Sequence, residues 1–191
     1  MRRIVVFTLS TLDGAVDDPN RYFPDPEATG PSAPAYDEVM GRLEAELIAR
    51  QDAVLLGRGM YDEWSRYWPT SDEQPFADFI NSVHKYVLSS RELSPSAWAN
   101  TEQVSGPLHE VVADLRSRPG DGDIGVHGSI TLAQSLLAAG LADELQLVLA
   151  PVVDPLGRRL FSSMSELHRL QLDRCTQTDS GALWLVLRPA G

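Results

Sequence analysis

The amino-acid sequence predicts an α/β fold, with a mainly parallel sheet, helices on both faces of that sheet and an antiparallel C-terminal edge. Three observations lead to this prediction. Short continuous apolar runs, typical of strands covered on both faces, alternate with amphipathic segments. After Asp143 the helical spacing disappears and three extended runs follow. No repeat or linker-like change in composition divides the chain, so we expect residues 1–191 to form a single domain.

Two periodicities locate the individual elements. Strands are predicted where apolar residues run without interruption, at 3–9 (RIVVFTL), 52–57 (DAVLLG), 84–89 (HKYVLS) and 123–127 (DIGVH). Helices are predicted where apolar residues recur every three or four positions, as in Tyr36, Val39, Met40, Leu43 and Leu47, in Leu108, Val111, Val112 and Leu115 after Pro107, and in Ile130, Ala133, Leu137 and Leu141. Gly140 is a plausible stop for the last helix.

The C-terminal runs are predicted to be strands at 144–153, 167–178 and 182–191. The last two are joined through Asp179-Ser180-Gly181, a turn signal between extended segments. This hairpin supplies the antiparallel edge of the predicted sheet.

Composition excludes several classes of function. The net charge of −11 argues against nucleic-acid binding, which needs a basic face. No apolar run approaches the length needed to cross a bilayer, and the run that opens the chain is interpreted as a strand rather than a signal peptide. Cys175 is the single cysteine, so we expect no intramolecular disulfide, no metal site and a cytoplasmic location.

Residues 15–34 form the longest segment without periodicity. The segment leaves the end of the first predicted strand, where open α/β sheets bind ligands. It is interpreted either as a lid over such a site or as a surface excursion, and Tyr22 and Phe23 slightly favour the lid.

The first candidate ligand-binding turn follows the strand at 52–57. Gly57 and Gly59 flank Arg58, and a helix is expected to begin near Met60. Glycines allow close ligand approach, a helix N-terminus offers free N–H groups, and an arginine can hold phosphate with two bonds. A turn that needs glycine for steric reasons alone is an equally good interpretation.

The second candidate turn, Ser89-Ser90-Arg91, follows the strand at 84–89. Two hydroxyls and a guanidinium suit a terminal phosphomonoester, such as the 2′-phosphate that distinguishes NADPH from NADH. The alternative is a polar loop in which one of the two serines acts as a cap.

The third candidate turn is His127-Gly128-Ser129-Ile130, between a strand and a helix. Its backbone N–H groups can face a diphosphate, and Ser129 can also cap the helix. His127 is either a cofactor contact or a strand-end histidine bonded to a neighbouring loop. The carboxyl ends of parallel strands meet at one edge of a sheet, so the three turns together predict a site for an extended dinucleotide. No G-x-G-x-x-G of the Rossmann type follows the first strand.

These motifs resemble the dihydrofolate reductase-like superfamily, and most closely the C-terminal reductase domain of the riboflavin-biosynthesis deaminase-reductase. STLDG at 10–14, LLGRGMYDEW at 55–64, HGSITLAQSLLAAGLADELQLVLAPVV at 127–153 and RRLF at 158–161 carry the resemblance in order along the chain. The resemblance implies a three-layer fold and an NADPH-dependent oxidoreductase that reduces a small heterocycle, a pteridine or a pyrimidine. It implies that Gly57 to Met60 and Gly128 to Ile130 meet the phosphates, and that Ser89 to Arg91 read the 2′-phosphate. Ala15 stands where the riboflavin reductases usually carry lysine, and His127 where they tend to carry an acid.

Asp13, where the first strand meets the predicted lid, is the candidate for a substrate contact or proton relay; the alternative is a plain Asp-Gly turn. Tyr61, Trp64 and Trp68 share one helical face, which we expect to pack against the sheet or a partner subunit, and we expect a homodimer. A non-catalytic dinucleotide- or flavin-binding protein is the alternative function.

Overall fold

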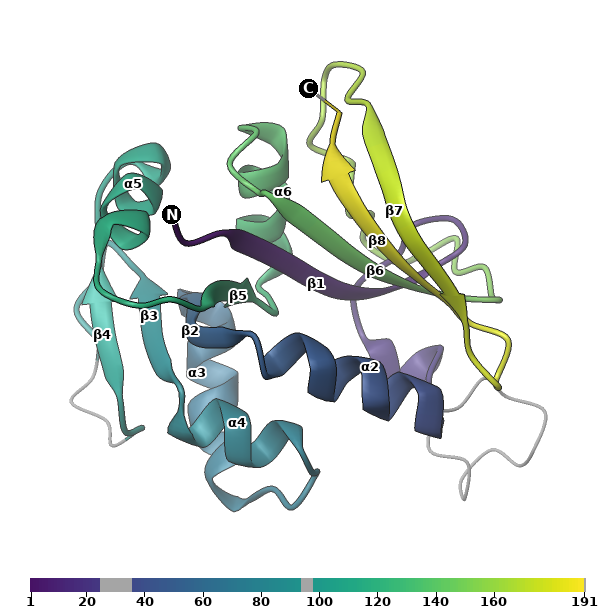
Figure 1. Cartoon of the computed structure of the whole chain (residues 1–191), viewed down its shortest axis with the longest axis horizontal. Coiled ribbons are helices and arrows are strands. Elements are labelled where there is room, and N and C mark those ends of the chain that lie inside the picture. Colours follow the sequence, from purple (N-terminus) through teal and green to yellow (C-terminus); the bar gives the residue numbers. More distant parts are fainter. Residues whose placement is uncertain (25–35, 94–97, 191) are drawn as a thin grey trace.

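A computed structural model describes residues 1–24, 36–93 and 98–190 of the chain (Figure 1). The described strands form one eight-stranded sheet: β1 (Ile4–Thr11), β2 (Gln51–Gly57), β3 (His84–Leu88), β4 (Thr101–Val104), β5 (Asp123–Val126), β6 (Glu144–Ala150), β7 (Leu170–Gln177) and β8 (Leu183–Pro189). That residues 1–191 form a single domain stays a prediction, and one continuous sheet is consistent with it.

The strand order is β4-β3-β2-β5-β1-β6-β8-β7. The six strands from β4 to β6 are parallel to one another, and β8 and β7 add an antiparallel edge. This arrangement confirms the predicted α/β class and its antiparallel C-terminal hairpin, whose turn contains Gly181 at a φ of 85°. Because β1 to β6 are parallel, all their carboxyl ends lie along one edge of the sheet, the carboxyl edge.

Helices cover both faces of the sheet in three layers (Figure 1). One face packs against α5 (Leu108–Ser117) and α6 (Ile130–Ala138), and the other against α2 (Glu38–Ile48), α3 (Arg58–Tyr67) and α4 (Phe76–Ser82). The uninterrupted apolar run of β1 has its reason here: Ile4 and Val6 enter the α5–α6 core, whereas Val5 and Phe7 enter the core beneath α2.

Some local structure differs from the predictions. The sequence reading missed β4 and α4, because TEQV is polar and short and FADFINS is too short to show helical spacing. The helix α3 begins at Arg58 rather than near Met60. Tyr36 precedes α2 and is exposed, although it continues the apolar stripe in sequence. Two short 3₁₀ turns, η1 (Pro19–Arg21) and η2 (Trp68–Thr70), complete the described elements.

The amino ends of the central strands, the amino edge, are joined by ion pairs. Arg3 Nη2 lies 2.7 Å from Asp123 Oδ2, and Arg3 Nη1 lies 3.2 Å from Glu144 Oε2. Arg50 Nη2 lies 2.9 Å from the other oxygen of Glu144. The edge therefore links the starts of β1, β2, β5 and β6 through charges that the chain itself supplies.

Candidate functional site

Two of the three predicted turns lie side by side at the carboxyl edge. The turn between β2 and α3 adjoins the turn between β5 and α6, since β2 and β5 are neighbouring strands. Gly57 packs so closely against Ser129 that a Cβ atom at position 57 would collide with the Ser129 hydroxyl. Gly128, at a φ of 145°, lies against the methyl group of Met60 in the same way. Gly57 and Gly128 let the two turns come into contact. For the turn at Gly57, a steric requirement for glycine was one of the two interpretations of the sequence.

The N-termini of α3 and α6 both lie at these turns. Neither helix has a hydrogen bond from a side-chain cap. Ser129 occupies the cap position of α6, but its hydroxyl makes no capping bond, so the predicted capping role of this side chain is wrong. Space is open around Gly59, where a Cβ atom would meet no other atom within 4 Å. First-turn N–H groups and the positive ends of two helix dipoles therefore lie together.

The third predicted turn joins the other two through Arg58. Arg58 Nη1 donates to the Glu92 carbonyl at 3.2 Å, and Arg58 Nε donates to Asp62 at 2.8 Å. Within the turn, the Ser89 hydroxyl bonds both the carbonyl and the N–H of Arg91, which makes Ser89 a local turn residue. The structure thus brings Arg58, Arg91 and Ser129 to one edge of the sheet.

Arg91 and Ser90 are exposed beyond this turn. The guanidinium of Arg91 has no hydrogen bond or ion pair with any residue in the described part of the chain. In a chain of net charge −11, this is a cation held at the carboxyl edge without a counter-ion from the described residues.

The ring of His127 does not face the space around the two adjoining turns. It packs among aromatic side chains on one face of the sheet. The imidazole lies among the rings of Phe7, Phe76 and Phe79, with centroids 5.2 to 6.0 Å away. Its Nε2 is 2.7 Å from Gln51 Oε1, and its buried Nδ1 has no partner among the described residues. Burial lowers the pKa of His127 to about 3. The ring is therefore neutral at physiological pH.

Asp13 lies at the end of β1, as predicted, but its carboxylate is held by the chain itself. Oδ1 accepts bonds from the Thr11 hydroxyl at 2.6 Å and from the Asp154 N–H at 3.0 Å, and Oδ2 lies 2.9 Å from Arg159 Nη2. The Thr11 bond above all, with the Asp154 N–H and the charge of Arg159, holds the pKa of Asp13 below its usual range. Asp13 fastens the end of β1 to the loop that follows β6.

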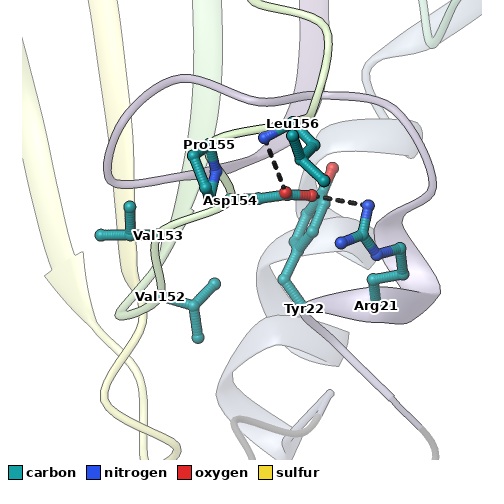
Figure 2. Close-up of a pocket in the computed structure, with 7 residues that line it drawn as sticks. All are labelled: Arg21, Tyr22, Val152, Val153, Asp154, Pro155 and Leu156. Carbon is teal, nitrogen blue, oxygen red and sulfur yellow. Dashed lines mark hydrogen bonds and ion pairs between the residues drawn. The ribbon is translucent and has the colours of Figure 1, made fainter.

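A pocket of about 250 Å³ opens next to this junction (Figure 2). It lies between η1 and the loop after β6, and Arg21, Tyr22, Val152, Val153, Asp154, Pro155 and Leu156 line it. Sequence reasoning missed Arg21 and Asp154, because neither belongs to a spaced motif.

The first part of the predicted lid is packed rather than free. Ala15 bridges to Arg159, Val16 is buried, and Tyr22 and Phe23 are buried against the core beneath α2. Residues 25–34 of the predicted lid lie outside the described residues. Tyr61, Trp64 and Trp68 pack into the chain's own core with α4, which is one of the two packing roles predicted for them.

The described residues include neither a membrane-spanning helix nor a metal-binding cluster. In the ranges 1–24, 36–93 and 98–190, no helix has the length and apolar character needed to cross a membrane. The same ranges hold no group of three or more histidine, cysteine or acidic side chains arranged to bind a metal ion.

The fold and the three converging turns define an α/β protein of the dihydrofolate reductase-like class. Dihydrofolate reductase from Enterococcus faecalis, solved as a complex with NADP(H), is similar to this chain with a TM-score of 0.63 at 11% identity, over 99% of this chain and 97% of that one. The sequence profile of the RibD C-terminal domain matches residues 2–184. The chain belongs to the RibD C-terminal domain family.

Two further solved structures are similar over their whole lengths. A putative riboflavin biosynthesis protein from Shewanella sp. has a TM-score of 0.74 at 20% identity, covering 99% of each chain. A pyrimidine reductase-like protein from Corynebacterium diphtheriae has a TM-score of 0.66 at 14% identity, covering 100% of this chain and 92% of that one. The search of curated proteins finds no match. At these identities the likenesses show the fold.

Proposed function

We propose that this protein is an NADPH-dependent reductase that transfers hydride to a small heterocyclic compound of the pteridine or pyrimidine type. One observation carries the proposal: two helix N-termini without a side-chain cap, and the guanidinium of Arg91, which has no partner among the described residues, occupy adjacent strand ends at the carboxyl edge. Family membership and the printed names of the similar structures, a pyrimidine reductase-like protein and a reductase complexed with NADP(H), agree with this chemistry.

The donor set fits the cofactor along its length. In the proposal, the first-turn N–H groups of Gly59, Met60 and Ile130 receive the diphosphate, since helix N-termini favour anions and the space around Gly59 is open. Arg91 and Ser90 receive the 2′-phosphate, and Arg58 positions their turn by holding the Glu92 carbonyl. His127 takes part through its backbone, because its ring is directed into the aromatic core.

The cofactor supplies the hydride, and the residues of the chain orient the reactants. The strand order supports one direction for the bound cofactor: with the phosphomonoester end over β3 and the diphosphate over β2 and β5, the reactive end would extend toward β1 and β6. The pocket beside Asp154 lies at that end and is therefore the space proposed for the heterocycle.

Thermal denaturation with each nicotinamide cofactor tests the proposal. NADPH should raise the melting temperature more than NADH does at the same concentration, because binding to the folded state alone stabilises it. Shifts that are negligible, or equal for the two cofactors, would contradict the proposal. The cofactor-loaded protein should then oxidise NADPH when pteridines or aminopyrimidines are added, seen as loss of the reduced nicotinamide absorbance.

A non-catalytic dinucleotide- or flavin-binding protein is the second candidate. The observation that favours it is the engagement of Asp13, the tentative catalytic residue, by Thr11, Asp154 and Arg159. Tight NADPH binding without turnover on any heterocycle would support this candidate over the reductase.

A homodimer built on β7 is part of the proposal. Among the described strands β7 pairs only with β8, and seven of its eight residues are exposed, including Leu170 and Leu172. An edge of this kind is a template for pairing with another chain.

Light scattering after size exclusion tests the dimer. Leu172→Glu should convert it to a monomer, whereas Leu12→Glu, an equally exposed leucine at the carboxyl edge, should leave it intact.

The single, exposed Cys175 of β7 suits the reducing cytoplasm in which we propose the enzyme works.

A further inference from the structure

The pocket beside the end of β1 contains one buried carboxylate whose hydrogen bonds are incomplete. Asp154 is 7% exposed. Its Oδ1 accepts the Leu156 N–H at 3.2 Å, whereas its buried Oδ2 accepts no hydrogen bond from the described residues. Arg21 Nη1 lies 2.8 Å from Oδ2 as an ion pair (Figure 2). A buried carboxylate is stabilised only by donors aimed at both oxygens, so one position at Oδ2 is available to an incoming N–H group.

The backbone of Asp154 is fixed, which keeps the carboxylate in place. Its N–H donates to Asp13 Oδ1 at 3.0 Å, and its carbonyl accepts from Arg159 Nη1 at 2.8 Å. The same two residues, Asp13 and Arg159, pair with each other. Asp13 and Arg159 are thus positioning residues: they fasten the Asp154 loop to the end of β1 before any ligand arrives.

Arg21, the counter-ion, is held far less firmly. Its side chain is 53% exposed, whereas that of Asp154 is 9% exposed. Arg21 belongs to the three-residue turn η1, and it lines the pocket together with Asp154, to which it is joined (Figure 2). A half-exposed arginine can exchange its partner for water at small cost, but a buried carboxylate cannot.

We propose that Asp154 binds the amino-bearing edge of the heterocyclic substrate and that Arg21 is the counter-ion which this edge replaces. A ring carrying an amino group next to a ring N–H presents two parallel donors, the arrangement that suits a carboxylate. Val152, Pro155 and Leu156 provide apolar walls for the ring. This inference rests on the proposed function and adds that the substrate is an amino-substituted heterocycle recognised through a carboxylate on the loop after β6.

Calorimetric titration of the NADP⁺-loaded protein with 2,4-diaminopyrimidine and with uracil, which lacks amino groups, tests the proposal. Protonation of 2,4-diaminopyrimidine at N1 provides the ring N–H next to an amino group that a carboxylate can pair with. The diamino compound should bind more tightly than uracil. Asp154→Asn should weaken its binding about tenfold or more, because a charge-assisted pair of bonds is lost. Asp18→Asn is the matched control: it makes the same charge change in the same region, its backbone φ of 51° suits asparagine, and it does not line the pocket. This control should bind as the wild type does.

Arg21→Gln distinguishes recognition from a merely structural ion pair. Removing the counter-ion should strengthen binding of 2,4-diaminopyrimidine, opposite in sign to the effect of Asp154→Asn. The same direction of change in both variants, or no binding of the diamino compound by the wild type, would overturn the inference. The NADPH-induced rise in melting temperature separates the two levels: its absence in the wild type refutes the proposed function, whereas its persistence with unselective pyrimidine binding refutes the Asp154 inference alone.

Discussion

At the amino ends of β1, β2, β5 and β6, arginines and carboxylates bind one another, whereas at the carboxyl ends of β2, β3 and β5 the described residues leave two helix N-termini and one arginine without side-chain partners. Glu144 accepts from Arg3, Arg50 and Gln146. At the opposite edge, the N-termini of α3 and α6 have no side-chain cap, and Arg91 has no counter-ion among the described residues. The two edges are built on one set of strands, so the difference lies in what each edge is arranged to bind.

Burial explains why the amino edge must be complete. Glu144 is 3% exposed, and a carboxylate there costs several kcal/mol unless it is paired. The Gln146 amide that bonds Glu144 is itself bonded by Trp184 Nε1 at 2.7 Å, which extends the network to β8. Although burial opposes ionisation, the bonds from Gln146 and Arg50 and the nearby positive charges hold the pKa of Glu144 below its usual range. The amino edge therefore contributes stability, and the carboxyl edge is where we propose that the cofactor binds.

The largest expected effect is that of Glu144→Ala on the amino edge. It should lower the free energy of unfolding by about 3 kcal/mol, the low end for breaking a buried pair, because Arg3 and Arg50 are half exposed and regain water. Urea denaturation measures the loss, and the NADPH dissociation constant should stay unchanged while the protein is folded. A change in that constant without a loss of stability would contradict the division between the edges.

Much of this division could be predicted from the sequence, because turn chemistry is local. Gly57 to Met60, Ser89 to Arg91 and Gly128 to Ile130 each stand where an apolar run ends, and parallel strands bring such ends together. The apolar run of β1 likewise predicts burial on both faces. The exact bounds of the elements depend on hydrogen bonds that the sequence does not show, and β4 and α4 were missed because their segments are too short to show a periodicity.

The partners of single polar residues could not be predicted in this way. Asp13 and Asp154 are 141 positions apart, and only the pairing of β1 with β6 brings them together. The sequence left two interpretations of His127, a cofactor contact or a strand-end histidine bonded to a neighbouring loop. The ring instead lies against Phe76 and Phe79 of the missed helix α4. Side-chain direction at a site thus depends on tertiary contacts.

His127 gives the second prediction, of about 2 kcal/mol, because its imidazole lies among aromatic rings at the carboxyl edge. With its pKa lowered to about 3, the folded state takes up no proton as the pH falls below 6.5, whereas the unfolded chain does. This difference should remove about 2 kcal/mol of stability between pH 7.5 and pH 5.0. The loss begins near pH 6.5 and continues toward pH 3.

Urea denaturation of His127→Phe at both pH values isolates this contribution. Phenylalanine keeps the packing against Phe7 and Phe76 but cannot take up a proton, so the fall in stability on acidification should be smaller than in the wild type by about 2 kcal/mol. His109→Gln is the control, since His109 is exposed. Equal acid dependence in His127→Phe and the wild type would show that the imidazole is protonated in the folded state.

The smallest effect is expected at Arg91. The arginines of the amino edge have carboxylate partners, whereas Arg91 has none among the described residues. Arg91→Ala should weaken NADPH binding about tenfold, which is about 1.4 kcal/mol, and leave NADH binding unchanged, since only NADPH carries the 2′-phosphate. Stability should not change, because the side chain has no partner among the described residues. Arg66→Ala makes the same charge change at the far end of α3 and should leave both affinities as they are. Calorimetric titration with both cofactors measures the selectivity. If Arg91→Ala weakens the binding of NADPH and NADH alike, the turn after β3 binds the part that the two cofactors share. The proposed direction of the dinucleotide across the strands would then have to be reversed.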